Sequence, residues 1–175
     1  MQFAKDSFYV ALSQRLSQLN PARTVSINGV TRAAIMVAEN ELITAALPIQ
    51  DAFFVIWGAA QICDEFGGAP EPLVGIECTI WYGTSGATED ASDRGRCMTE
   101  LDSELLRICS PPFTDKRDYT KAESTPLDSN VFWTTPEIAP VYPNSEAHDT
   151  RAMMKQNGPV FHVAKLRVFF YPEVA

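Results

Sequence analysis

The fold depends most on one stretch near the end of the chain, VFHVAKLRVFFYPE (residues 160–173). It has neither proline nor glycine between Val160 and Tyr171, and apolar residues fill one alternating face, as in a β-strand. At ~3.3 Å per residue, a strand of this length spans roughly 40 Å, which is longer than most strands. One face has the composition of a protein core and consists of Val160, His162, Ala164, Leu166, Val168 and Phe170.

The second face of this strand is amphipathic, with aromatic residues at its ends and cations in its middle. It consists of Phe161, Val163, Lys165, Arg167, Phe169 and Tyr171. We expect the first face to pack under helices and the second either to face solvent or to meet another subunit. An exposed apolar patch of this kind often marks an interface. We therefore predict an interface formed by Phe161, Lys165, Arg167 and Phe169.

The rest of the chain places two helices among several strands. Apolar residues repeat at helical spacing over about 6–19 and again over about 92–109. Strands are expected on both sides of Asn28-Gly29, the strongest short hairpin signal, and over about 52–57 and 73–82. Because helices and strands do not alternate regularly, we predict a single α+β domain over residues 1–175. Its sheet is expected to be mostly antiparallel or mixed, with both helices on one face.

Two polar segments interrupt this pattern, over 110–130 and 142–158, and we predict that both are loops. The first contains three prolines and few aliphatic residues, so little burial would offset the entropy of ordering it. Between them, VFWTTPEIAPVYP can hold an edge strand that prolines interrupt.

Composition and charge narrow the classes of molecule that the protein is expected to bind. The chain has 175 residues, of which 46% are hydrophobic and 21% charged, as in a folded soluble protein. Its net charge of −8 argues against binding free duplex DNA or an anionic membrane. The longest apolar run, AFFVIWGAA, is too short to span a bilayer, and the N-terminal residues lack the apolar stretch of a signal peptide. We therefore expect a cytoplasmic protein.

No catalytic, cofactor or metal site is expected from the motifs. The glycines of GTSGATEDASDRG (83–95) precede a helix, but the lysine of a P-loop is missing and the segment is acidic. His148 falls in a polar segment, and His162 lies on the core face of its strand, where a hydrogen-bonded core histidine is expected. None of the four cysteines forms a CxxC pair, so we expect reduced and mostly buried thiols.

An alternative function stays open at this point. A small-molecule-binding or enzymatic α+β domain would have a pocket between the sheet and the helices, lined by Phe54, Trp57 and Trp81. Tryptophans in strand-like runs are more often core or interface residues.

The order of elements resembles the phage tail terminator, or tail-completion, family. DSFYVALSQRLSQLNPARTVSI (6–27) is similar to that family's opening helix and first strand. GIECTIWYGTSGATEDASDRGRCMTELDSELLRI (75–108) is similar to its central strand, link and second helix, and residues 160–173 resemble its closing strand. The segments 110–130 and 142–158 are longer than a minimal terminator needs.

The resemblance implies a structural protein and no enzymatic activity. Such a protein forms a ring, usually of six subunits, that caps the tail tube of a phage or prophage-like particle and joins it to the neck. Its partners would be further copies of itself and the tube and neck proteins, with no sequence-specific nucleic acid and no membrane. An acidic ring suits this role, because DNA slides through a negative channel without sticking.

Overall fold

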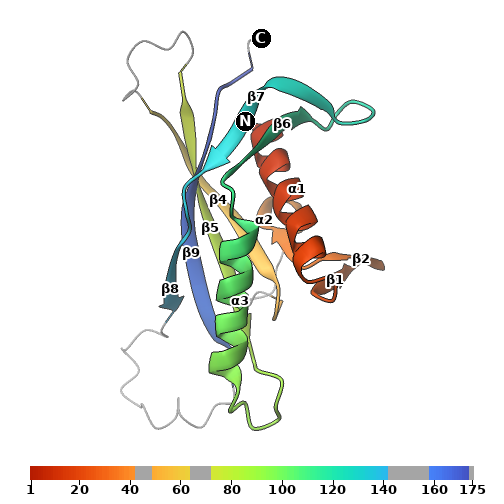
Figure 1. The fold of residues 1–175 in the computed structure, drawn as a ribbon, viewed down its shortest axis with the longest axis vertical. Helices are drawn as coiled ribbons and strands as arrows, with labels where there is room; N and C mark the ends of the chain where they lie inside the picture. The colour runs from red at the N-terminus through yellow and green to blue at the C-terminus, as the bar shows by residue number, and fades with distance from the viewer. Residues whose placement is uncertain (42–48, 64–71, 142–157, 174–175) are drawn as a thin grey trace.

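A computed structural model describes residues 1–41, 49–63, 72–141 and 158–173 (Figure 1). The helices are α1 (Gln2–Leu19), the one-turn α2 (Ala38–Glu41) and α3 (Arg94–Ile108). The strands are β1 (Thr24–Ile27), β2 (Val30–Ala33), β3 (Ile35–Val37), β4 (Phe53–Ile62), β5 (Val74–Thr84), β6 (Phe113–Asp118), β7 (Thr125–Trp133), β8 (Glu137–Val141) and β9 (Val160–Phe170). The expected α+β class is confirmed, with a curled sheet and both long helices on one face.

The final strand is central to the sheet, whose order is β3-β4-β5-β9-β7-β6 with β8 also beside β9. β3 and β4 run parallel, and the other neighbouring pairs are antiparallel. β9 pairs with β5 along its whole length, from Val160 opposite Thr84 to Phe170 opposite Val74. β1 and β2 form a separate ribbon, and its turn has positive φ at Asn28 and Gly29, as the hairpin signal predicts.

Aromatic contacts join α1 to the sheet. The Phe8 ring meets Trp57 and Trp133 edge-on, with centroid distances of 5.6 and 5.0 Å. The Arg15 guanidinium then links α1 to the end of α3, because it donates to the carbonyl oxygens of Ile108 (2.9 Å) and Pro111 (2.8 Å). Both long helices are thereby fixed on the same side of the sheet.

The expected core face of β9 is confirmed for the second half of the strand. Ala164, Leu166, Val168 and Phe170 are all buried in the hydrophobic core. His162, on the same face, is partly exposed and lies 2.9 Å from the carboxylate of Asp102 in α3, so it is the hydrogen-bonded histidine that its position predicts. The two faces of β9 are therefore assigned as the alternation indicates.

The predicted loop over 110–130 is wrong. Most of this segment forms β6 and the first part of β7, an antiparallel hairpin that curls over α1 (Figure 1). Polar strands form here because residues far away in the chain supply hydrogen-bond partners and counter-charges. The Arg117 N–H donates to Ser7 Oγ of α1 at 2.9 Å. Lys116 is 1% exposed and pairs with Glu173. The other predicted loop, 142–158, lies almost wholly outside the described residues.

Among the helices described, none is both long enough and apolar enough to cross a membrane.

Candidate interface on the uncovered face of the sheet

The second face of β9 belongs to a broad sheet surface turned away from α1 and α3. Directly opposite residues in an antiparallel pair point to the same side of the sheet. Trp81 is opposite Val163 in β9 and opposite Phe54 in β4, so these three share the face that carries Lys165 and Arg167. We call this surface the open face.

Phe161 and Phe169, predicted as interface residues, are partly buried on the open face because each lies over a glycine of β5. Phe161 is opposite Gly83 and Phe169 is opposite Gly75. A Cβ on Gly83 would overlap the Phe161 ring, and a Cβ on Gly75 would come within 3.1 Å of the Phe169 ring. The rings therefore fill space that the glycines leave, which the sequence of β9 alone cannot indicate.

A row of three phenylalanines crosses one end of the open face. Phe132 of β7 is opposite Phe169, and their rings stack at 5.3 Å with an interplanar angle of 17°. Phe113 of β6 is in turn opposite Phe132, and it is 58% exposed. Sequence reasoning missed Phe113 and Phe132 as site residues, because Phe113 fell in the predicted loop and Phe132 was read only as part of an edge strand. We call these three residues the aromatic row.

The middle of the open face is charged and nearly balanced. Arg167 Nη2 lies 3.9 Å from Glu77 Oε1, and the exposed Lys165 is opposite Glu137 of β8. These four side chains and Thr134 line a shallow hollow of about 390 Å³. Two cations and two carboxylates thus meet on a chain of net charge −8. A second acidic copy would be repelled less by this surface than by most of the protein.

The residues of the alternative pocket do not come together between the sheet and the helices. Trp57 is on the helix side, where it contacts Phe8 and lies 5.5 Å from the Lys5 ammonium. Phe54 and Trp81 are on the open face. Since the two tryptophans lie on opposite sides of the sheet, they cannot line one cavity.

A partly buried polar cluster joins the helix side of β9 to α3. Asp102 Oδ1 accepts a hydrogen bond from the Tyr82 hydroxyl at 2.7 Å and lies 2.9 Å from His162 Nδ1. Burial, reinforced by this hydrogen bond and the Asp102 charge, raises the pKa of Tyr82. Among the described residues, no serine, threonine or cysteine side chain hydrogen-bonds to His162. These contacts hold β5 and β9 against α3.

The thiols are less uniformly buried than expected. Cys78 and Cys109 are buried, whereas Cys63 and Cys97 are partly exposed. Burial raises the pKa of the Cys109 thiol to about 12, so this group stays protonated and unreactive at neutral pH. His148 lies outside the described residues.

Comparison with known proteins assigns no relative: no protein-family model matches the sequence, and no curated protein matches it.

Proposed function

We propose that the chain is a structural, non-enzymatic subunit of a phage or prophage-like tail. It assembles with copies of itself into a ring, of about six subunits as the resemblance implies, that caps the tail tube and joins it to the neck. The protein is made in the bacterial cytoplasm and is then incorporated into the particle. The resemblance in element order, carried by residues 6–27, 75–108 and 160–173, supports this proposal.

The open face carries the proposal. Its aromatic row ends in a phenylalanine that is 58% exposed, and its centre holds Lys165 and Arg167 within a near-neutral group of charges. Apolar rings beside balanced charges favour contact with another protein over contact with nucleic acid. The interface therefore extends beyond the predicted Phe161, Lys165, Arg167 and Phe169 to include Phe113.

Charge reversal at the centre of the open face tests this assignment. Lys165 is exposed, and Lys165→Glu would place a third carboxylate beside Glu77 and Glu137. We expect loss of self-assembly by native mass spectrometry with an unchanged melting temperature. Lys121→Glu is the matched control, because Lys121 is 64% exposed in the β6–β7 turn, outside the open face. Assembly that survives Lys165→Glu as well as Lys121→Glu would place the interface elsewhere.

The biological setting has a separate test. Genes for tail-tube and tape-measure proteins beside this gene are the expected neighbours. Neighbouring genes from a metabolic pathway, together with a monomeric protein, would contradict the proposal.

A further inference from the structure

A ring requires a second surface, because a contact between two different patches is what generates rings, whereas a patch that meets itself stops at a dimer. The proposed function supplies only the open face. The second surface must be a hollow elsewhere on the chain that fits the most exposed part of the open face. Phe113 is the obvious projecting group, since its ring ends the aromatic row and is 58% exposed.

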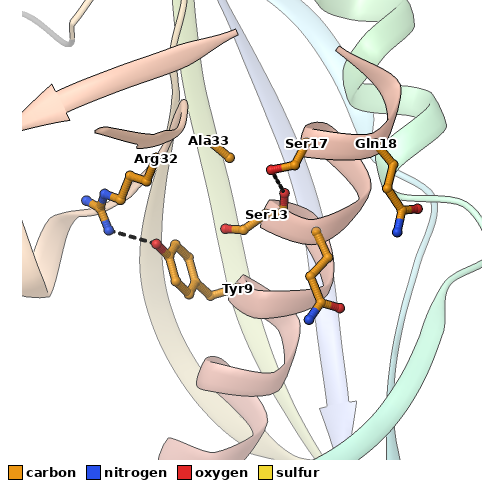
Figure 2. A pocket seen from close by; sticks show the side chains of 7 residues that line it. Tyr9, Ser13, Ser17, Gln18, Arg32 and Ala33 are labelled. Carbon is orange, nitrogen blue, oxygen red and sulfur yellow. Dashed lines mark hydrogen bonds between the residues drawn. The ribbon is translucent and has the colours of Figure 1, made fainter. Parts of the chain in front are cut away.

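The groove between α1 and β2 is such a hollow (Figure 2). It has a volume of about 460 Å³, and the Tyr9 ring and Ala33 line it together with polar side chains of α1 and Arg32 of β2. Pockets that hold small ligands begin at about 300 Å³, so the groove has room for one aromatic side chain. Ser13 Oγ, also in the lining, is buried without a hydrogen-bond partner in the described part of the chain.

Charges near the two surfaces are complementary. Asp115 is 68% exposed, lies 3.9 Å from the Arg117 guanidinium, and follows Phe113 by two residues in β6, so it accompanies the ring on the same side of the strand. Arg32 lines the groove and is 31% exposed. It donates to Tyr9 Oη at 2.7 Å and pairs with Glu41, which leaves guanidinium donors for a further carboxylate.

We propose that Phe113 of one copy inserts into the α1–β2 groove of the next copy, with Asp115 meeting Arg32. This contact rests on the proposed self-assembly and identifies the second surface that a ring needs. Burial of one phenylalanine ring removes roughly 150–250 Å² from water. An aromatic side chain seated in a pocket is the usual centre of an interface. The occupant is a second copy of this chain, because both complementary surfaces belong to it.

Two variants remove one surface each. Phe113→Ala removes the inserted ring, and Ser17→Trp fills the groove from its exposed rim on α1. We expect each variant to weaken self-association at least thirtyfold, which corresponds to about 2 kcal/mol. Phe113→Leu and Ser17→Ala are the matched controls, because they keep an apolar projection and an open groove. Sedimentation measures association, and thermal unfolding confirms that each variant folds.

Mixing the two defective variants gives the decisive result. The Ser17→Trp chain keeps its ring and the Phe113→Ala chain keeps its groove, so one intact contact can form between them. We expect the equimolar mixture to form a dimer of one copy of each variant and to stop there. No dimer in the mixture, or a wild-type chain that stays monomeric at its solubility limit, overturns the contact. If Ser17→Trp unfolds, Gln18→Trp at the same groove replaces it.

The outcome is separable from that of the proposed function. The experiment uses the purified chain alone and no tail component. A mixed dimer in a protein whose neighbouring genes are not tail genes would retain the contact and refute the tail assignment. If a phage-like particle carries this protein but the two variants form no mixed dimer, the tail assignment is retained and the contact is refuted.

Discussion

The buried Lys116 makes a sharp prediction about how the C-terminal residues are held. Its ammonium group lies 2.6 Å from the Glu173 carboxylate, also donates to the Tyr171 carbonyl oxygen, and is 5.6 Å from the centroid of the Phe170 ring. These contacts tie the residues after β9 to the β6–β7 hairpin. Glu173→Gln would leave a buried cation without its counter-charge.

The size of the effect follows from the burial of the two partners. Breaking a fully buried ion pair costs about 3–5 kcal/mol. Glu173 keeps 31% of its side chain exposed, and Lys116 keeps the Tyr171 carbonyl, so we expect Glu173→Gln to cost about 1–3 kcal/mol. Adding Lys116→Met should restore most of the loss, because methionine brings no charge into the site. Urea unfolding at neutral pH measures both.

The same pair predicts the pH dependence. Burial alone would raise the pKa of Glu173, but the Lys116 hydrogen bond and charge together hold it below its ordinary value. A carboxyl with a lowered pKa in the folded state stabilises the protein above its ordinary pKa and loses this contribution as the pH falls. The stability gap between wild type and Glu173→Gln should thus be full at neutral pH and shrink in acid. A gap that is constant with pH, or a double variant as unstable as Glu173→Gln, refutes the reasoning.

Two further substitutions test the register of the sheet. Leu166→Ala should lower the free energy of unfolding by about 2–5 kcal/mol in urea, because Leu166 is 6% exposed in the core; a loss below 1 kcal/mol would argue that the two faces of β9 are reversed. Gly83→Ala should lower it by about 1–3 kcal/mol, since the added Cβ would come within 2.6 Å of the Val160 carbonyl oxygen. Gly95→Ala in α3 is its control, because its Cβ meets nothing within 4 Å and alanine favours a helix by about 1 kcal/mol; a melting temperature that Gly83→Ala leaves unchanged would contradict the packing.

Local pattern was sufficient wherever one face of a strand is buried and the other is not, or where a tight turn needs particular φ angles. The alternation in β9 predicted its buried residues, and Asn28-Gly29 predicted the turn of the β1–β2 ribbon. Both signals act over a few residues, through the period of the strand and the φ angles of a turn. A strand buried on one face or a tight turn can therefore be recognised without knowing its partners.

The β6–β7 hairpin could not be recognised in this way. Its sequence is polar, and the residues that stabilise it are far away in the chain: Lys116 pairs with Glu173, and the Arg117 N–H donates to Ser7 Oγ. Strand preference depends on the surface against which a strand packs more than on the strand itself. The same limit applies to the interface, where the partial burial of Phe161 follows from Gly83 on a neighbouring strand.

The strands at the edge of the sheet beside the aromatic row explain why we propose that copies associate through side chains and not through backbone pairing of edge strands. An open edge strand would allow copies to join by backbone hydrogen bonds. Here α1 blocks part of the β6 edge, because Ser7 accepts from the Arg117 N–H and Arg15 donates to the Phe113 carbonyl at 3.2 Å. Pro140 removes a donor from β8, the strand beside β9. With edge pairing obstructed on these two strands, the exposed Phe113 ring is the better route to a specific contact, and a side-chain contact of this kind is what the two-variant mixture detects.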